Sequence, residues 1–407
     1  MTYAPPPASS SGPPQQSPRP EFASALAQPT VYQPPARPPK PVPHLQVQVP
    51  PAPVHAHRTA LIWLFGILAF MLLALVGYFV AALGVVAAGV GLVLALIPLT
   101  IVFIGVHHID RWEPEPRRLI IFALAWGAIA AVGLTLLADI GITLMLGPRP
   151  DEVSAVFQAP IVEEITKCFG VFLVYVIARR SFDGPVDGVV YGALVGAGFA
   201  FTENIQYFAV SLIEGGGAEL TATFVVRALM SPFAHAMFTA LTGYAIGRVA
   251  RRGGSAASAF GAGCFGLIGA IALHAFWNGS AVYADFWAMY VTLQVPLFIG
   301  FILAIVALKR EEARLTLERL GDYAKAGWFT PQEVLMLATR DGRKTGLAWA
   351  GTLRGDRTRL MKTFIGDATA LATNRQRALT GRDDKALDQE RLLLARITAT
   401  RQQLLSY

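Results

Sequence analysis

Long apolar runs dominate the chain between residues 59 and 308. Each is about 20 residues or longer, the length that an α-helix needs to cross a hydrocarbon core of about 30 Å. The predicted membrane spans are 59–79, 81–105, 118–146, 156–178, 187–213, 222–247, 258–282 and 286–308. The pattern therefore predicts an all-α fold, a polytopic membrane helix bundle of about eight transmembrane helices.

The two ends of the chain differ in composition from this membrane region. Residues 1–57 contain 17 of the 27 prolines, which prevents backbone ladders and predicts a disordered cytoplasmic tail. Residues 309–407 are polar and basic, with apolar residues at helical spacing, and predict a cytoplasmic helical region. The domain boundaries that we expect are thus 1–57, 58–308 and 309–407.

The net charge of +7 flanks the membrane region rather than forming one basic face. Residues 309–407 hold 19 Lys and Arg against 12 Asp and Glu, whereas residues 59–308 hold 11 against 14. This distribution favours a lipid bilayer with anionic headgroups as the partner, and not nucleic acid. The two cysteines fall inside predicted spans, so they support neither a disulfide framework nor a thiolate zinc site.

The loop charges predict the orientation in the membrane. Alternate loops, including 111–118, 179–180 and 248–252, carry nearly all the arginines, while the loops between them carry mainly Asp and Glu. Because basic loops stay on the cytoplasmic side, both termini are expected in the cytoplasm of an integral, multi-pass cell-membrane protein.

Four consecutive predicted spans carry polar residues in pairs spaced by four. Ionisable groups inside a bilayer cost several kcal/mol each unless they pair or line a wet cavity, so they are candidates for function. Four residues advance a helix by about 400°, which places each pair on one helix face. The pairs are Glu163 and Lys167, Glu203 and Tyr207, His235 and Thr239, and His274 and Asn278.

The predicted topology places these groups in one layer, roughly 10–20 Å below the outer surface. Glu163 and Glu164 in such a layer would suit a general base acting on water, and His274 with Asn278 could donate hydrogen bonds to an oxyanion. Alternatively, four side chains offer nitrogen and oxygen ligands for zinc. They are Glu164, Glu203, His235 and His274. The zincin pattern HExxH is absent, and both mechanisms stay open.

The polar motifs over about residues 100–308 resemble those of the PrsW family of intramembrane peptidases, relatives of the CAAX prenyl-proteases and bacteriocin-immunity proteins. The motifs are Glu163-Glu164-x-x-Lys167, Asp187-Gly188-x-Val190-Tyr191-Gly192, Gly198-Phe199-Ala200-Phe201-x-Glu203-Asn204-x-x-Tyr207, His235 and His274-x-x-x-Asn278. The resemblance implies an integral membrane endopeptidase, classed as a metallopeptidase, that cleaves membrane-anchored proteins such as anti-sigma factors on their extracytoplasmic side.

Together these arguments predict that Glu163 or Glu164 activates water, that Glu203 and His235 position the water or a metal, and that His274 and Asn278 stabilise the oxyanion. The supporting residues would be Lys167, Asn204 and Tyr207. Two other functions use the same polar layer. One is a proton- or cation-coupled transporter, and the other is a non-catalytic membrane peptide-binding or immunity protein.

Several features have a simpler structural explanation. Glu163, Glu164 and Lys167 could form a buried ion pair that fixes the helix register. Asp139 and Arg227 also lie in predicted spans, but no spacing links them to the layer, so we predict pairing or snorkelling and place them outside the site. The glycines at 188, 192 and 196 repeat every fourth residue and predict close helix packing.

Overall fold

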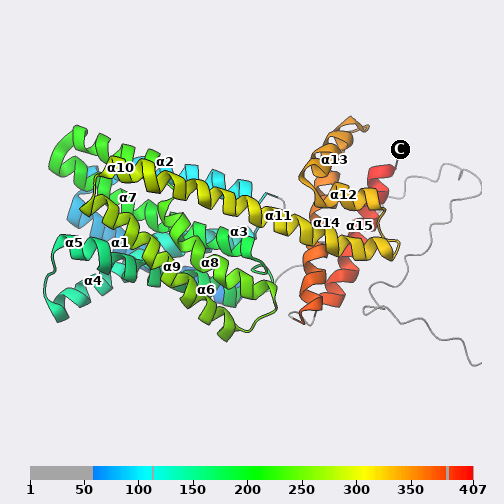
Figure 1. The fold of residues 1–407 in the computed structure, drawn as a ribbon, viewed down its shortest axis with the longest axis horizontal. Helices are drawn as coiled ribbons and strands as arrows, with labels where there is room; N and C mark the ends of the chain where they lie inside the picture. Colours follow the sequence, from blue (N-terminus) through cyan, green and yellow to red (C-terminus); the bar gives the residue numbers. More distant parts are fainter. Residues whose placement is uncertain (1–57, 112–113, 382–384, 407) are drawn as a thin grey trace, which may run out of the picture.

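The structure is a computed structural model that describes residues 58–111, 114–381 and 385–406. The predicted proline-rich tail, 1–57, lies outside the described residues. Every regular element in these described ranges is a helix, which confirms the predicted all-α class. Figure 1 shows a long bundle joined by one helix to a second, smaller group of helices.

Six helical stretches of the described chain are long and apolar enough to cross a membrane. They are Ile62–Leu83, Val85–Ile109, Arg117–Leu146, Pro185–Arg251, Ala256–Tyr283 and Phe286–Lys325. The predicted count of about eight is therefore not confirmed. Two local features account for the difference: Pro185–Arg251 holds two predicted spans in one stretch, and the predicted span at 156–178 contains the charged residues Glu163, Glu164 and Lys167.

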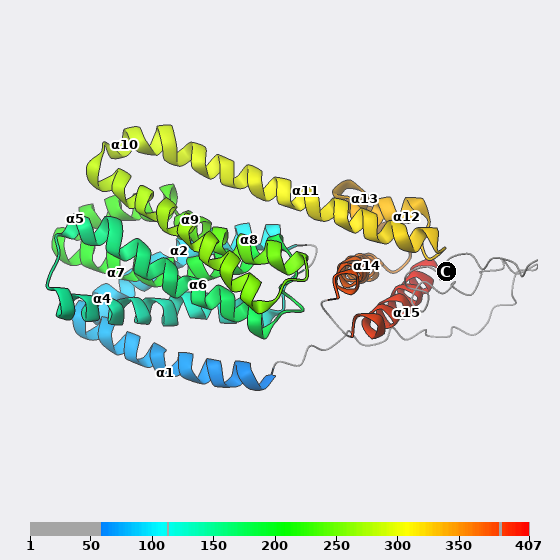
Figure 2. The same ribbon diagram turned by 60° about the horizontal axis from the view of Figure 1, so that its bottom comes forward.

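The bundle follows the chain in order, with short π-helical segments between some helices. It comprises α1 (Arg58–Leu83), α2 (Val85–Ile109), α3 (Arg117–Ala125), η1 (Trp126–Ala131), α4 (Val132–Leu146), α5 (Asp151–Val153), η2 (Ser154–Gln158), α6 (Ala159–Ile177), α7 (Pro185–Phe224), η3 (Val225–Met230), α8 (Ala234–Arg251), α9 (Ala256–Tyr283), α10 (Phe286–Met289), η4 (Tyr290–Gln294) and α11 (Val295–Lys325). In Figure 2, α1 and α11 lie on opposite sides of this bundle.

Helix α7 forms the centre of the bundle and packs against α2, α3, η1 and α8. Its glycines explain how α8 can lie so close. A Cβ added at Gly188 would lie 2.0 Å from the carbonyl oxygen of Gly243, and one at Gly196 would lie 2.3 Å from that of His235. These distances leave no room for a side chain, which confirms the packing role predicted for the glycine repeat.

The chain beyond the bundle folds around a hydrophobic core of its own. Helix α11 continues without a break from the apolar stretch into this region, where it meets α12 (Pro331–Ala338), α13 (Arg340–Thr352), α14 (Thr358–Leu379) and α15 (Ala386–Leu405). Leu320 of α11 is buried there with Leu371 of α14 and Leu394 of α15. At the start of α12, Thr330 and Glu333 form a reciprocal capping box, which fixes the turn after α11.

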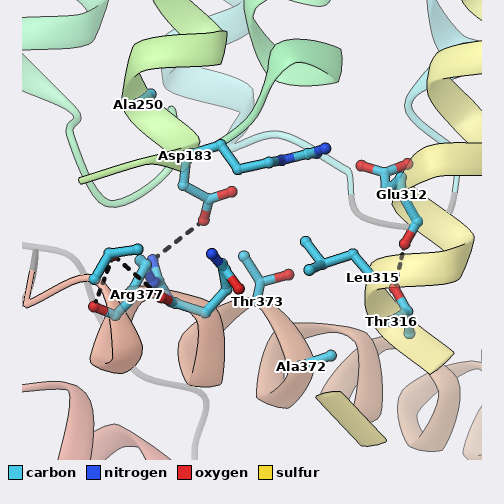
Figure 3. A pocket seen from close by; sticks show the side chains of 11 residues that line it. Asp183, Ala250, Glu312, Leu315, Thr316, Ala372, Thr373 and Arg377 are labelled. Atoms are coloured by element: carbon cyan, nitrogen blue, oxygen red, sulfur yellow. Dashed lines mark hydrogen bonds and ion pairs between the residues drawn. The ribbon is translucent and has the colours of Figure 1, made fainter. Parts of the chain in front are cut away.

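Ion pairs connect this second core to one end of the bundle. Glu311 of α11 accepts hydrogen bonds from Arg248 at 2.8 Å and from Arg251 at 3.0 Å, both near the end of α8. Arg377 of α14 lies 3.5 Å from Asp183, in the turn before α7. Asp183, Arg251 and Arg377 also line a small cavity of about 20 Å³ between the two helix groups (Figure 3).

Replacing Gly188 with alanine is expected to loosen α7 against α8. The new Cβ would collide with backbone that cannot rotate away, so we expect a loss of about 1–3 kcal/mol in the free energy of unfolding. Thermal unfolding of the purified protein in detergent measures the effect. Gly89→Ala in α2, where an added Cβ meets nothing within 4 Å, is the matched control. Equal unfolding temperatures for the two variants would contradict the close packing.

Candidate active site

Four helices of the bundle bring the predicted polar residues together. Glu163, Glu164 and Lys167 come from α6, Glu203 from α7, His235 from α8 and His274 from α9. The helix spacing explains the local arrangement, because residues three and four apart in α6 lie on one face. The site is thus assembled between helices rather than within one motif.

Lys167 lies at the centre of this cluster and is completely buried. Its Nζ is 3.0 Å from Glu163 Oε2 and 2.8 Å from Glu164 Oε1. It also lies 3.1 Å from His235 Nδ1 and 3.8 Å from the centre of the Phe199 ring. The ammonium group therefore uses its donors on three side chains from two helices, and its position fixes α6 against α8.

Glu164 has both carboxylate oxygens engaged. Besides Lys167, Oε1 is 3.1 Å from His274 Nδ1, and Oε2 accepts a hydrogen bond of 3.0 Å from Thr239 Oγ1. Its side chain has no solvent exposure, whereas that of Glu163 is 9% exposed. The Oε1 atom of Glu163 takes part in none of the contacts that we describe. Glu163 is therefore the carboxylate better placed to accept a proton from water.

The ring of His235 connects Lys167 to Glu203. Its Nε2 lies 2.9 Å from Glu203 Oε2, while its Nδ1 faces Lys167. An ammonium can only donate a hydrogen bond, so Nδ1 accepts and Nε2 carries the proton that is donated to Glu203. The surroundings thus assign the tautomer of this histidine.

Arg227 of η3 pairs with Glu203 and completes this part of the cluster. Its Nε donates a hydrogen bond of 2.7 Å to Asn204 Oδ1, and its guanidinium lies 3.8 Å from the centre of the Tyr207 ring. Asn204 and Tyr207 therefore support Arg227, which in turn contacts Glu203. Of the two explanations predicted for Arg227, pairing or snorkelling, the structure shows pairing, and it places Arg227 in contact with the predicted polar layer rather than apart from it.

Sequence spacing did not identify Arg227 and gave Thr239 no role of its own. Arg227 follows Glu203 by 24 residues, across the non-helical Gly216 and the change to π-helix at η3. No single helical period relates the two positions.

Asn278, predicted as an oxyanion donor, gives one hydrogen bond of 2.8 Å from Nδ2 to the carbonyl oxygen of Ala155. Its amide keeps a second N–H.

A cavity of about 240 Å³ lies next to the cluster. Its polar lining includes Glu203, Arg227, His235, His274 and Asn278. Apolar side chains complete the wall: Val226, Phe238, Trp277, Val282 and Phe286. A mainly apolar cavity with a few convergent polar groups is typical of a site that binds and orients another molecule.

Four side chains of the cluster have the chemistry of a zinc site. One ligand atom from each of Glu163, Glu164, His235 and His274 lies within 4.8 Å of the others. Two carboxylates and two imidazoles are ligands that Zn²⁺ accepts. The set contains Glu163 in place of the predicted Glu203, which instead contacts the far nitrogen of His235. Because Lys167 Nζ contacts three of the four residues, its ammonium would have to move to admit an ion.

Comparison with known proteins supports the predicted resemblance. Residues 115–303, which contain every residue of the cluster, match the model of the PrsW family, described as intramembrane metalloproteases. Over 139 residues the chain is 29% identical to Protease PrsW of Geobacillus kaustophilus and 28% identical to that of Bacillus subtilis. Over 96 residues it is 36% identical to Protease PrsW of Oceanobacillus iheyensis.

These alignments are partial. They cover 34%, 34% and 24% of this chain and 57%, 59% and 40% of the Geobacillus, Bacillus and Oceanobacillus proteins. The matched part of the chain thus spans 57% and 59% of the Geobacillus and Bacillus relatives and 40% of the Oceanobacillus relative. No solved structure matches it.

Lys167→Met is expected to destabilise the bundle strongly. The change leaves two carboxylates in a buried site without their cation, which typically costs about 3–5 kcal/mol in the free energy of unfolding. Thermal unfolding in detergent tests this, and adding Glu164→Gln to the same chain should recover part of the loss. Lys309→Met removes the half-exposed pair with Glu312, and we expect about 0–1 kcal/mol from this control. Similar losses in the two single variants would refute the central role of Lys167.

Proposed function

We propose that this chain is an intramembrane endopeptidase of the PrsW family, whose model its residues 115–303 match, and that it hydrolyses peptide bonds of membrane-anchored proteins with carboxylate-activated water. The observation that carries the proposal is the pair Glu163 and Glu164 beside His274, which lines a cavity within an apolar helix bundle. The protein is an integral membrane protein, so its substrate would reach this cavity from the bilayer or its outer boundary.

In the proposed reaction, Glu163 accepts a proton from the attacking water. Glu164 is held by Lys167, Thr239 and His274, and it keeps His274 in a fixed orientation. When His274 donates from Nδ1 to Glu164, its Nε2 is left facing Glu163 Oε2 at 4.0 Å. A water molecule held by His274 Nε2 and by the Glu163 carboxylate, whose Oε1 lies outside these contacts, would have an acceptor on each side, which suits the removal of a proton.

Groups that line the cavity would stabilise the oxyanion and bind a substrate side chain. The free N–H of Asn278 is placed to donate to the oxyanion that forms when water adds to the scissile carbonyl. The apolar wall formed by Phe238, Trp277 and Phe286 would hold a substrate side chain. His274 would donate to the same oxyanion only in its doubly protonated form.

The formal charges of the cluster do not balance, and one more cation or proton would neutralise it. Glu163, Glu164 and Glu203 carry three formal negative charges against the two positive charges of Lys167 and Arg227. If a Zn²⁺ is used, Glu163, Glu164, His235 and His274 would hold it, and it would supply Lewis acidity and an activated water when bound. The carboxylate mechanism and the metal-assisted one thus use the same residues.

The proposed orientation rests on the charges of the loops, and the proposed substrate class rests on that orientation. Alternating arginine-rich loops support cytoplasmic termini. That orientation would place the cavity in the outer half of the bilayer, where it would meet the extracytoplasmic segment of a single-span protein. We therefore propose membrane-anchored regulatory proteins, such as anti-sigma factors, as the substrate class.

Glu163→Gln and Glu164→Gln should each reduce cleavage of candidate single-span proteins in reconstituted vesicles by about 10²-fold or more, the usual contribution of a general base or its equivalent. Cleavage is followed by gel shift and mass spectrometry, with and without a chelator. Glu214→Gln, at an exposed glutamate outside the site, is the matched control and should cleave like the wild type.

Each outcome selects a mechanism. Loss in both site variants with full activity in chelator supports metal-free catalysis, and loss on chelation with recovery on adding Zn²⁺ supports a metal. Full activity of both variants would refute the proposed site. Retained substrate binding without cleavage, even in the wild type, would favour a peptide-binding protein, and pH-driven ion flux through the vesicles would favour a transporter.

A further inference from the structure

We propose that Arg227 is a positioning residue of the active site, which holds Glu203 so that Glu203 fixes the orientation and tautomer of His235. This inference rests on the proposed function and deepens it. It adds a residue from η3 to a site that otherwise comes from α6, α7, α8 and α9. The argument depends on contacts of the guanidinium group and not on its charge alone.

Arg227 has three different partners, each of which uses a separate part of its side chain. One terminal nitrogen pairs with Glu203 Oε2, Nε donates to Asn204 Oδ1 at 2.7 Å, and the plane of the guanidinium stacks on Tyr207. The rigid fork of an arginine can satisfy all three directions together, whereas the ammonium of a lysine acts as a point charge. Three fixed contacts leave Glu203 little freedom to rotate.

Glu203 in turn contacts the centre of the cluster through His235. Its Oε2 is shared between Arg227 and His235 Nε2, and the other ring nitrogen points to Lys167. A carboxylate behind a histidine commonly fixes which nitrogen is protonated and how the ring is oriented. With Arg227 removed, Glu203 would be free to leave His235. The ring could then turn away from Lys167, and its Nδ1 would no longer be fixed as an acceptor.

The position of Arg227 raises a competing explanation. Its side chain lines the cavity and is 22% exposed, so it could contact substrate directly. A direct contact would affect substrate affinity whether or not Glu203 is present. A positioning role requires Glu203 and changes the rate of the chemical step. The two explanations therefore predict different kinetics.

A double-mutant cycle separates them, with Arg227→Gln, Glu203→Gln and the combined variant assayed in vesicles. We expect Arg227→Gln to lower kcat by about 10–100-fold with KM within about 3-fold, as is usual for loss of a group behind a site histidine. In the Glu203→Gln background the same change should alter kcat by less than about 3-fold, because residues that act as a unit are not additive. Arg227→Lys should recover part of the rate.

Arg248→Gln is the matched control, since Arg248 pairs with Glu311 at the far end of α8 and should leave cleavage unchanged. A raised KM with normal kcat in Arg227→Gln, or equal losses in both backgrounds, would overturn the positioning role. Wild-type kinetics in Arg227→Gln together with loss of cleavage in Glu163→Gln would refute this inference and leave the proposed function intact.

A spectroscopic measurement tests the inference without any substrate. Nitrogen-15 spectra of histidine-labelled protein in lipid nanodiscs, with the His235 signal assigned by its loss in His235→Asn, report which ring nitrogen carries the proton. We expect Nε2–H in the wild type and in Arg227→Lys, and a mixture of tautomers in Arg227→Gln. An unchanged His235 signal in Arg227→Gln would overturn the proposal.

Discussion

The buried contact between Lys167 and the carboxylates of Glu163 and Glu164 is the interaction on which the site depends. Burial of any one of these charges inside an apolar bundle would be costly, and the three are acceptable there only together. Lys167 Nζ also contacts His235, so the same atom determines where α8 lies against α6. The charge balance of the site and the arrangement of its helices therefore have one origin.

The contact between Glu203 of α7 and His235 of α8 depends on helices that approach more closely than ordinary side chains allow. Gly192 and Gly196 of α7 lie against the backbone of α8 at Thr239 and His235, where an added Cβ would be 2.7 and 2.3 Å from a carbonyl oxygen. Without that approach, His235 could not reach Glu203. The glycine repeat has no chemical role, yet it sets the distances of the polar network.

The fold class and most of the site could be predicted from the sequence because both follow from regular helix geometry. Spacing of four residues correctly placed Glu163 with Lys167, and ionisable residues in apolar runs identified Glu203, His235 and His274. The membrane-crossing stretches were harder to divide. Within Pro185–Arg251 the non-helical Gly216 lies between two predicted spans, and η3 changes the helix winding before the turn at 231–233. Hydrophobicity alone contains no record of such local changes.

Spacing also fails between helices, which is why Arg227 was missed. An arginine in an apolar segment is as compatible with snorkelling to the surface as with pairing, and only the path of the chain after α7 decides between them. The same limit affected the predicted zinc ligands. The sequence could not show that Glu203 contacts Nε2 of His235, whereas Glu163 belongs to the four residues whose ligand atoms lie together.

The three carboxylates of the site have different contacts and therefore different roles. Glu164, with both oxygens occupied, and Glu203, held by Arg227 and His235, serve as fixed acceptors. Glu163 alone combines contact with Lys167, slight exposure and an oxygen outside the network. Three acidic residues that look equivalent in the sequence thus become one reactive group and two that orient the histidines. Glu164 is fixed because both of its oxygens accept contacts, whereas the Oε1 of Glu163 lies outside these contacts and stays available to accept a proton.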